Sequence, residues 1–240
     1  MGADGPGGNE REWPGGTVLS RLPGVLTDEL LRLGTPKPCR AGTVLLHQGE
    51  PSTHVFLLGH GKQPRVACVK VTVAARNSTE SLLGIRISGD LVGEMGVLRE
   101  GPRSATVTTC RAMTVHRIPI DSFRLFLRRR EEAWRVVCHM IADRLDWANR
   151  RRLDFAGYDT AVRLARVLIE LAAHHGTSGE AGTRLGIELS QPEFGKLIGA
   201  GRDAIGLAVR QLKDLEFIAY RYRTVTILDL NGLAAFADPD

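Results

Sequence analysis

The sequence predicts an α+β fold with three parts: an N-terminal antiparallel β-roll, a long helix, and a C-terminal winged helix-turn-helix. Short β-branched and apolar runs separated by Gly, Pro and polar clusters fill residues 40–118. The stretch Glu131–Phe155 contains no Gly or Pro and has helical periodicity. A helix-capping sequence, a glycine turn and two strand-like runs follow near the end. A chain of 240 residues is long enough for two such domains.

The composition is that of an ordinary globular protein with a positive net charge. The sequence is 43% hydrophobic and 25% charged, and its net charge of +5 permits a polyanionic partner. The segment after residue 158 carries slightly more acidic than basic residues. Nucleic-acid binding therefore has to be argued from where individual Lys and Arg residues lie.

The N-terminus predicts a tail and no membrane segment. Residues 1–18 are rich in Gly and Pro, which is typical of a flexible tail. No apolar run approaches the ~18–20 residues that a membrane span needs, and the start lacks the apolar region of a signal peptide. We expect a cytoplasmic protein with no membrane partner.

The cysteines do not predict a metal site, and no enzyme motif is present. Cys39, Cys68, Cys110 and Cys138 form no CxxC pair and are expected to be small buried hydrophobic residues. The sequence has no GxSxG motif of serine hydrolases, no HExxH motif of zinc proteases, no Walker A loop, and no GxGxxG dinucleotide-binding loop at a strand-to-helix junction. The sequence therefore favours a binding protein over an enzyme.

The sensor domain is expected over residues 19–130. Six runs predict its strands: Val44–His47, Val55–Leu58, Arg65–Val73, Leu82–Ser88, Ala105–Thr109 and Met113–Ile118. Two short helices, Thr27–Leu33 and Asp121–Arg129, are expected to flank them.

A dimerisation helix is expected over residues 131–157. Apolar residues recur on alternating four- and three-residue steps, at Trp134, Cys138, Ile141, Leu145 and Ala148, with Phe155 further along. This is an a/d seam, although Arg152 falls on it. The alternative is a helix packed only on its own domain; the narrow apolar stripe favours a seam between two chains, and hence a two-fold homodimer.

The pattern over residues 158–240 predicts a DNA-binding winged helix-turn-helix. An amphipathic helix, Thr160–His174, precedes a capping box formed by Ser190 and Glu193. After the turn Gly199–Gly201, a second helix presents Ile205, Val209 and Leu212 on one face. The runs Phe217–Arg221 and Thr224–Leu228 are expected to form a two-stranded wing. Double-stranded DNA is the expected partner.

The most specific stretch of the sequence lies at residues 93–107. Gly93 and Glu94 open a short helical turn, and Arg103 and Ser104 follow nine residues later. Backbone N–H groups, a guanidinium and a hydroxyl around one pocket suit a phosphate. Glu94 is left to accept a hydrogen bond from a sugar hydroxyl.

This stretch resembles the phosphate-binding cassette of cyclic-nucleotide-binding domains, and residues 40–230 resemble the CRP/FNR superfamily of bacterial regulators. The runs Ala41–Glu50 and Val55–Leu58 are similar to that family's first β-roll strands. The resemblance implies a dimeric transcriptional regulator gated by cyclic AMP or another cyclic nucleotide, with RNA polymerase as a further partner. It places the ligand on Gly93, Glu94, Met95, Arg103, Ser104 and Asn149.

The chain departs from the family pattern in two places. Ala148 and Asn149 stand where cyclic-AMP receptors have a Thr-Ser pair that contacts adenine, and the connection Gly59–Arg65 is longer than the usual tight turn. The alternative is a constitutive or non-nucleotide-sensing regulator whose roll is structural or contacts a protein. In that case a buried Glu94–Arg103 ion pair would stabilise the roll.

Iron-dependent sensing, known in other branches of the superfamily, has little support in the sequence. No cysteine precedes Cys39, which argues against an N-terminal iron–sulfur cluster. For haem ligation only isolated candidates exist: His47, His54, His60 and Cys68.

The resemblance also identifies candidate DNA contacts. Arg202 and Asp203 match the start of the family's recognition helix, where Arg pairs with guanine and Asp accepts from cytosine, whereas Leu207 replaces a second Arg. Phosphate contacts are expected from Ser190, Gln191, Lys196, Arg210 and Lys213. An ordinary solvated helical face is the alternative.

Overall fold

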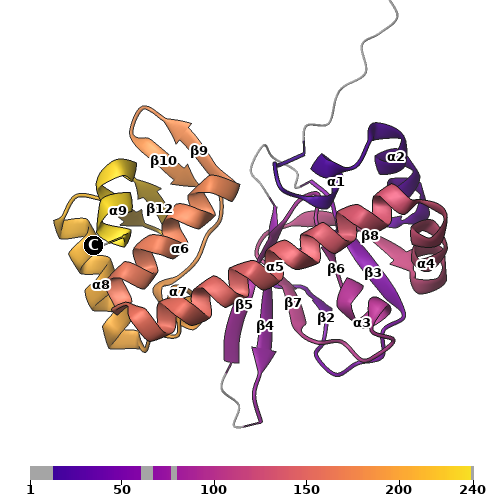
Figure 1. The fold of residues 1–240 in the computed structure, drawn as a ribbon, viewed down its shortest axis with the longest axis horizontal. Helices are drawn as coiled ribbons and strands as arrows, with labels where there is room; N and C mark the ends of the chain where they lie inside the picture. The colour runs from indigo at the N-terminus through magenta and orange to yellow at the C-terminus, as the bar shows by residue number, and fades with distance from the viewer. Residues whose placement is uncertain (1–12, 61–66, 77–79, 239–240) are drawn as a thin grey trace, which may run out of the picture.

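The computed structural model describes residues 13–60, 67–76 and 80–238. Two lobes lie at the two ends of one long helix, α5 (Figure 1). The helices are α1 (Val18–Arg21), α2 (Gly24–Leu33), α3 (Glu94–Leu98), α4 (Ile120–Arg129), α5 (Glu131–Gly157), α6 (Thr160–His175), α7 (Gln191–Ile198), α8 (Arg202–Asp214) and α9 (Leu230–Ala237).

The N-terminal lobe is the expected antiparallel β-roll. Its two four-stranded sheets have the orders β1-β8-β3-β6 and β2-β7-β4-β5. The strands are β1 (Thr35–Cys39), β2 (Val44–Leu46), β3 (His54–Leu58), β4 (Cys68–Ala74), β5 (Glu80–Ile87), β6 (Leu91–Val92), β7 (Thr106–Thr109) and β8 (Met113–Pro119). All six predicted runs form strands over their described residues, whereas Arg65 and Val66 of the third run, like most of the long connection predicted at 59–65, lie outside the described residues. The alternation of buried and exposed residues along them builds an apolar interior between the sheets.

Two features at the beginning of this lobe differ from the sequence prediction. The strand β1 contains Pro36 and Pro38, and it lies at the edge of its sheet, where a missing N–H is tolerated. Thr17 and Val18, placed by the sequence in a flexible tail, are buried, and Thr17 caps α1. Residues 1–12 of the expected tail lie outside the described residues.

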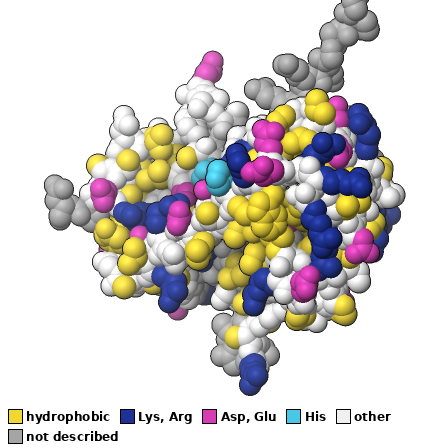
Figure 2. Space-filling view, turned by 45° about the vertical axis from the view of Figure 1, so that its right-hand side comes forward, with side chains coloured by type: hydrophobic (Ala, Val, Ile, Leu, Met, Phe, Trp, Pro, Cys, Tyr) yellow, Lys and Arg dark blue, Asp and Glu magenta, His cyan; other side chains and the backbone are white. Residues whose placement is uncertain are grey.

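The helix α5 matches the predicted long helix and has two unlike faces. Its buried residues Ala133, Val136, Val137 and Met140 pack against the roll. The predicted seam adjoins this buried stripe and is largely exposed: Trp134 is 44% exposed and Leu145 59% exposed, Cys138 and Ala148 are also exposed, and Ile141 is half-buried against the roll. Figure 2 shows hydrophobic side chains gathered near the centre of one face of the molecule.

Phe155 does not continue this seam. Its ring lies against Gly199, where a Cβ would come within 2.2 Å of Phe155 Cε1, and the Arg163 guanidinium lies 5.2 Å from the ring centroid. Gly199 also has φ +62°, so both its backbone and its ring contact require glycine. The last turns of α5 therefore join the C-terminal lobe.

The C-terminal lobe is a helix-turn-helix with a larger sheet than the predicted two-stranded wing. Its strands β9 (Gly176–Gly179), β10 (Gly182–Leu185), β11 (Ile218–Arg221) and β12 (Thr224–Ile227) have the order β11-β12-β10-β9. The hairpin β9–β10 is rich in Gly and was not predicted, because it lacks the β-branched alternation of a strand. The predicted capping box is confirmed, with Ser190 and Glu193 bonded reciprocally at the start of α7.

The two lobes share part of one hydrophobic core. Cys68, Leu82, Ile85 and Ile87 of the roll belong to the same apolar cluster as the buried residues of α6, α7 and α8. Burial of this surface fixes where the C-terminal lobe sits relative to the roll.

None of the helices in the described ranges is long and apolar enough to cross a membrane.

Candidate functional site: the roll pocket and the helix-turn-helix

A cavity of about 410 Å³ lies in the roll where the predicted cassette meets α5. Five of the six predicted ligand residues line it: Gly93, Glu94, Met95, Arg103 and Ser104. Leu46, Val92 and Val107 supply apolar walls, and Ile141, Arg144 and Leu145 of α5 close one side. A group bound in this cavity would touch both the cassette and α5.

Gly93 turns the chain into α3. It has φ +89°, and a Cβ there would lie 2.7 Å from Nη1 of Arg103. Only glycine permits both the left-handed backbone and this close approach. Glu94 then occupies the first residue of α3 and is buried.

Glu94 pairs with Arg144, so the Glu94–Arg103 pair that the sequence left open is wrong. Oε1 of Glu94 accepts from Nη1 of Arg144 at 2.6 Å, and Nη2 of Arg144 also donates to the Leu91 carbonyl at 3.0 Å. The two side chains are 5% and 19% exposed. Arg144 was missed because nothing in the sequence shows that a seam-flanking residue of α5 reaches a carboxylate fifty positions earlier.

Arg103 holds two backbone segments together. Its guanidinium donates to the carbonyls of Gly93 at 3.0 Å and His54 at 2.6 Å. Arg103 is 3% exposed, and its burial lowers its pKa below the usual value. Ser104 beside it is exposed. An Arg side chain offers five N–H donors, so these two bonds leave capacity for a phosphate.

Asn149 does not line the cavity of its own chain. It is exposed on α5, one turn beyond Leu145, which is the last residue of α5 that lines the cavity. The sequence prediction for Asn149 depends on a second chain and is not tested by one chain alone.

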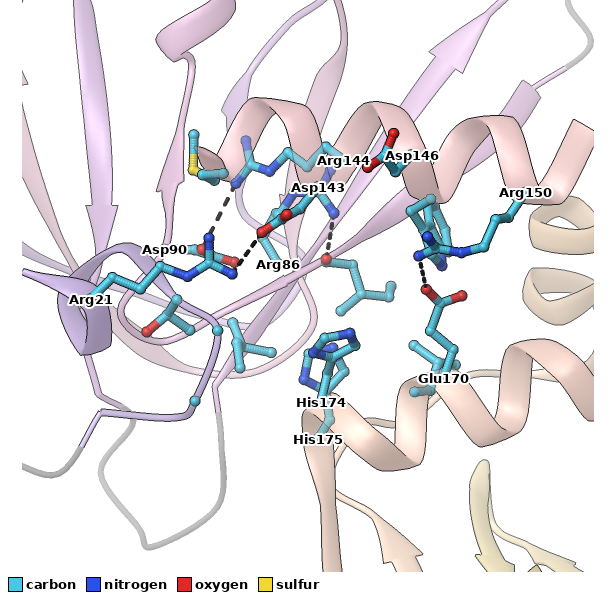
Figure 3. A pocket seen from close by; sticks show the side chains of 18 residues that line it. Arg21, Arg86, Asp90, Asp143, Arg144, Asp146, Arg150, Glu170, His174 and His175 are labelled. Carbon is cyan, nitrogen blue, oxygen red and sulfur yellow. Dashed lines mark hydrogen bonds and ion pairs between the residues drawn. The ribbon is translucent and has the colours of Figure 1, made fainter. Parts of the chain in front are cut away.

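A second cavity, of about 370 Å³, lies where β5, α5 and α6 meet the N-terminal segment (Figure 3). Arg86 and Arg144 line both cavities. Burial, and next the nearby charge of Arg144, lowers the pKa of Arg86 to about 9. Arg21 pairs with Asp143 at 2.6 Å across this cavity. Burial likewise lowers the pKa of His175 to about 4.

The recognition helix α8 presents the predicted base-reading residues to solvent. Arg202 and Asp203 occupy its first turn and are exposed, and Arg210 and Lys213 are exposed further along. Ile205, Ala208, Val209 and Leu212 form the buried face. Leu207, which occupies the position of the family's second Arg, is also exposed, at 63%.

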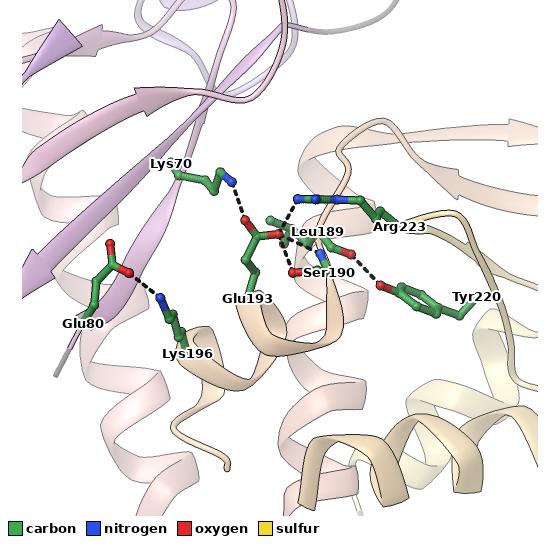
Figure 4. Close-up of polar contacts among 8 residues, drawn as sticks. All are labelled: Lys70, Glu80, Leu189, Ser190, Glu193, Lys196, Tyr220 and Arg223. Carbon is green, nitrogen blue, oxygen red and sulfur yellow. Dashed lines mark hydrogen bonds and ion pairs between the residues drawn. The ribbon is translucent and has the colours of Figure 1, made fainter. Parts of the chain in front are cut away.

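Another predicted phosphate contact, Lys196, lies against the roll of the same chain (Figure 4). Lys196 of α7 pairs with Glu80 of β5, and Lys70 of β4 pairs with Glu193 of α7. Glu193 also accepts from Arg223 at 2.7 Å and from Ser190 Oγ at 2.8 Å. The pairs Lys196–Glu80 and Lys70–Glu193 join α7 to the β4–β5 hairpin of the roll, and we call them the α7–hairpin contact. Gln191 is half-buried and lies near Gly206 of α8.

Comparisons with known proteins agree with both lobes. A family profile described as cyclic nucleotide-binding domain matches residues 36–130, and one described as Crp-like helix-turn-helix domain matches residues 162–236. A CRP-like cAMP-activated global transcriptional regulator of Mycobacterium tuberculosis is 27% identical over 210 residues, covering 88% of this chain and 89% of the relative. The cAMP-activated global transcriptional regulator CRP of Escherichia coli O157:H7 is 25% identical over 186 residues, covering 77% and 85%.

Solved structures share the fold. The c-di-GMP responsive global regulator CLP of Xanthomonas campestris superposes with a TM-score of 0.72 at 20% identity, covering 86% of this chain and all of that one. A CooA mutant from Carboxydothermus hydrogenoformans superposes with a TM-score of 0.70 at 19% identity, covering 88% and 90%. With a roll that matches the cyclic nucleotide-binding domain profile, followed by a Crp-like helix-turn-helix, the chain belongs to the CRP/FNR family and is a DNA-binding transcriptional regulator.

Proposed function

We propose that a cyclic nucleotide bound in the roll pocket gates DNA binding by this chain. The observation that carries the proposal is the Glu94–Arg144 ion pair, because it joins the cassette directly to α5. A ligand hydroxyl that bonds Glu94 competes with Arg144 and so acts on the helix that leads to the DNA-binding lobe. Ligand affinity and DNA affinity are then coupled reciprocally.

The donor set of the pocket fits such a ligand. The cavity of about 410 Å³ is within the range of small-molecule sites. In this proposal Arg103, Ser104 and the amides after Gly93 hold the cyclic phosphate, and Glu94 accepts a hydrogen bond from a ribose hydroxyl. The relative from Mycobacterium tuberculosis is cAMP-activated, and the Xanthomonas campestris regulator responds to c-di-GMP.

The exposed face of α5 supports a homodimer. Trp134, Cys138, Ile141, Leu145 and Ala148 lie on one stripe of the helix, beside the stripe that packs on the roll, and most of this stripe is exposed. A two-fold axis along this seam gives the dimer two symmetry-related recognition helices. These must lie about 34 Å apart to enter successive major grooves. We further propose that this regulator acts in the cytoplasm, contacts RNA polymerase and catalyses no reaction.

A constitutive or non-nucleotide-sensing regulator is the second candidate. It is favoured by the fact that Glu94 and Arg103 already have protein partners, in Arg144 and in the carbonyls of Gly93 and His54. The cassette would then stabilise the roll without any ligand.

Calorimetric titration with cyclic AMP and with cyclic GMP separates the two candidates. Any nucleotide that binds is then added to a DNA-binding assay at one fixed salt concentration, because phosphate contacts make affinity salt-dependent. Saturable binding that changes DNA affinity supports gating. Absence of binding together with intact DNA affinity supports the constitutive regulator.

A further inference from the structure

Two cysteines far apart in the sequence face each other across two strands of the roll. β4 and β7 are antiparallel neighbours, and their register places Val69 opposite Thr109. Cys68 is the first residue of β4 and Cys110 directly follows β7, so the two continue this register by one residue, and the Cys110 amide donates to the Cys68 carbonyl at 2.9 Å. Opposed residues of such a pair have Cα atoms about 4.5–5.5 Å apart. Disulfides span Cα separations of about 4.4–6.8 Å, so the backbone already brings the two thiols within bonding reach.

The two thiols have different environments. They hydrogen-bond to each other, and this bond, together with burial, raises the pKa of Cys68. The same bond lowers the pKa of Cys110, with further help from the charges of Lys70 and Arg223 and against the effects of burial and Glu193. Cys68 is 1% exposed, whereas Cys110 is only partly buried. A partly accessible thiol near cations is the one that reacts first, and its buried neighbour then resolves the product.

This pair lies where the roll meets the DNA-binding lobe. Cys68 belongs to the apolar cluster shared with α6, α7 and α8, and Cys110 packs against its margin. Lys70, two residues after Cys68, pairs with Glu193 at the start of α7. Arg111, directly after Cys110, pairs with Glu188 in the segment before α7. Movement of either cysteine therefore acts on contacts that position the helix-turn-helix.

We propose that Cys68 and Cys110 form a redox-active dithiol that hydroperoxides oxidise to a disulfide, and that this modification changes DNA binding. The Cys110 sulfur attacks the terminal oxygen of the hydroperoxide, breaks the O–O bond and becomes a sulfenic acid, while an alcohol, or water from hydrogen peroxide, leaves. The Cys68 thiol then attacks that sulfur, forming the S–S bond and releasing water. Two thiols are oxidised and one hydroperoxide is reduced.

Peroxide treatment followed by peptide mapping tests the chemistry. The full-length chain is reduced, freed of reductant, treated with hydrogen peroxide, freed of peroxide, unfolded in urea with an alkylating agent present, and digested without reductant. Of its four cysteines, Cys39 and Cys138 should be alkylated, and Cys68 and Cys110 should appear in one linked peptide. Cys110→Ser should abolish the link, Cys68→Ala should leave a sulfenic acid on Cys110 that dimedone traps, and Cys39→Ser should form the link as the wild type does. Alkylation of both Cys68 and Cys110 in the treated wild-type chain would overturn the proposal.

The effect on DNA binding rests on the proposed function and is measured separately. Treated wild-type protein should differ from untreated protein in DNA affinity, dithiothreitol should reverse the difference, and Cys110→Ser should show none. A linked peptide with unchanged DNA affinity would overturn the regulatory part. Because the link is detected by mass alone, failure of nucleotide gating leaves this chemical test intact.

Discussion

At the residue scale, the site depends on a charged pair that joins distant parts of the sequence. Glu94 was predictable as a pocket residue because the cassette is local in sequence. Its partner Arg144 was not, because the contact depends on how α5 crosses the roll. The pair is buried, and a buried charge without its partner is costly. Removal of Glu94 alone would therefore change both the proposed ligand binding and the stability of the chain.

Removal of Arg144 should destabilise the chain more than removal of an exposed arginine. Arg144→Gln leaves Glu94 as a buried, unpaired carboxylate, and we expect a loss of about 3–5 kcal/mol in the free energy of unfolding. Arg150→Gln breaks a more exposed pair with Glu170 and should cost about 0.2–1 kcal/mol. Urea denaturation measures both. Glu94→Gln added to Arg144→Gln should recover part of the loss, and a double variant that is no more stable than Arg144→Gln would contradict this account.

Arg202 should read sequence, whereas Lys213 should only hold the backbone of DNA. Arg202→Ala removes a side chain placed to pair with guanine and should cost about 1–3 kcal/mol in specific binding, with relaxed preference at one base pair of each half-site. Lys213→Ala should weaken binding to all sequences alike. Binding of a series of half-site variants distinguishes the two. If Arg202→Ala keeps the base preference of the wild type, the recognition helix has been misassigned.

The buried His175 should make stability fall in acid. Its pKa in the folded chain is lowered to about 4 by burial, whereas an unfolded histidine has a pKa of about 6.5. The unfolded chain therefore binds this proton more tightly. The contribution to stability is complete above pH 6.5 and is lost as the pH falls through about 4. His54, whose pKa is also lowered to about 4, adds in the same direction.

Comparison of His175→Gln with the wild type isolates this contribution. The variant should lose less stability than the wild type between pH 7 and pH 5, because it lacks one of the histidines whose pKa is lowered in the folded chain. Urea denaturation midpoints at the two pH values provide the measurement. Equal losses in both proteins would show that His175 is accessible to protons in the folded chain.

At the element scale, the sequence predicted the elements whose own pattern stabilises them. The helix α5 has an unbroken helical period, and α7 carries a capping box, so both were predicted. The edge strand β1 contains two prolines, and the hairpin β9–β10 is mostly Gly and polar residues, so neither has a strand pattern. These strands form because a neighbouring strand provides hydrogen-bond partners, and that information lies elsewhere in the chain.

The α7–hairpin contact should compete with DNA. Lys196 pairs with Glu80, so a predicted phosphate contact is occupied by the chain's own roll. Glu80→Gln removes the competing charge, and we expect tighter DNA binding without ligand by up to about fivefold, equivalent to about 1 kcal/mol. Glu100→Gln, which removes another carboxylate of the roll, paired with Arg124, is the matched control and should leave DNA affinity unchanged. Equal affinities of Glu80→Gln and wild type would show that the contact does not restrain α7.

At the scale of the whole molecule, one face of α5 remains to be covered. The helix already packs on the roll through Ala133, Val136 and Met140, so its exposed apolar side is not needed for the fold of one chain. The pocket opens beside the same helix, since Ile141 and Leu145 line it. A second chain on this side would bury the seam and place its own α5 next to each pocket. Dimer formation and ligand binding are therefore expected to depend on the same surface.

Replacement of Leu145 by Glu should dissociate the dimer. A two-fold seam brings the two copies of residue 145 close together, so Leu145→Glu places like charges in an apolar contact. The wild type should sediment as a dimer and the variant as a monomer that keeps its helical circular dichroism. Trp134→Glu, which lies on the seam but outside the pocket, should act in the same way. His139→Glu adds the same charge to an exposed position off the seam and should remain dimeric. A dimer that survives both seam substitutions would show that the chains associate through another face, and the recognition helices would then need a different two-fold axis to reach successive major grooves.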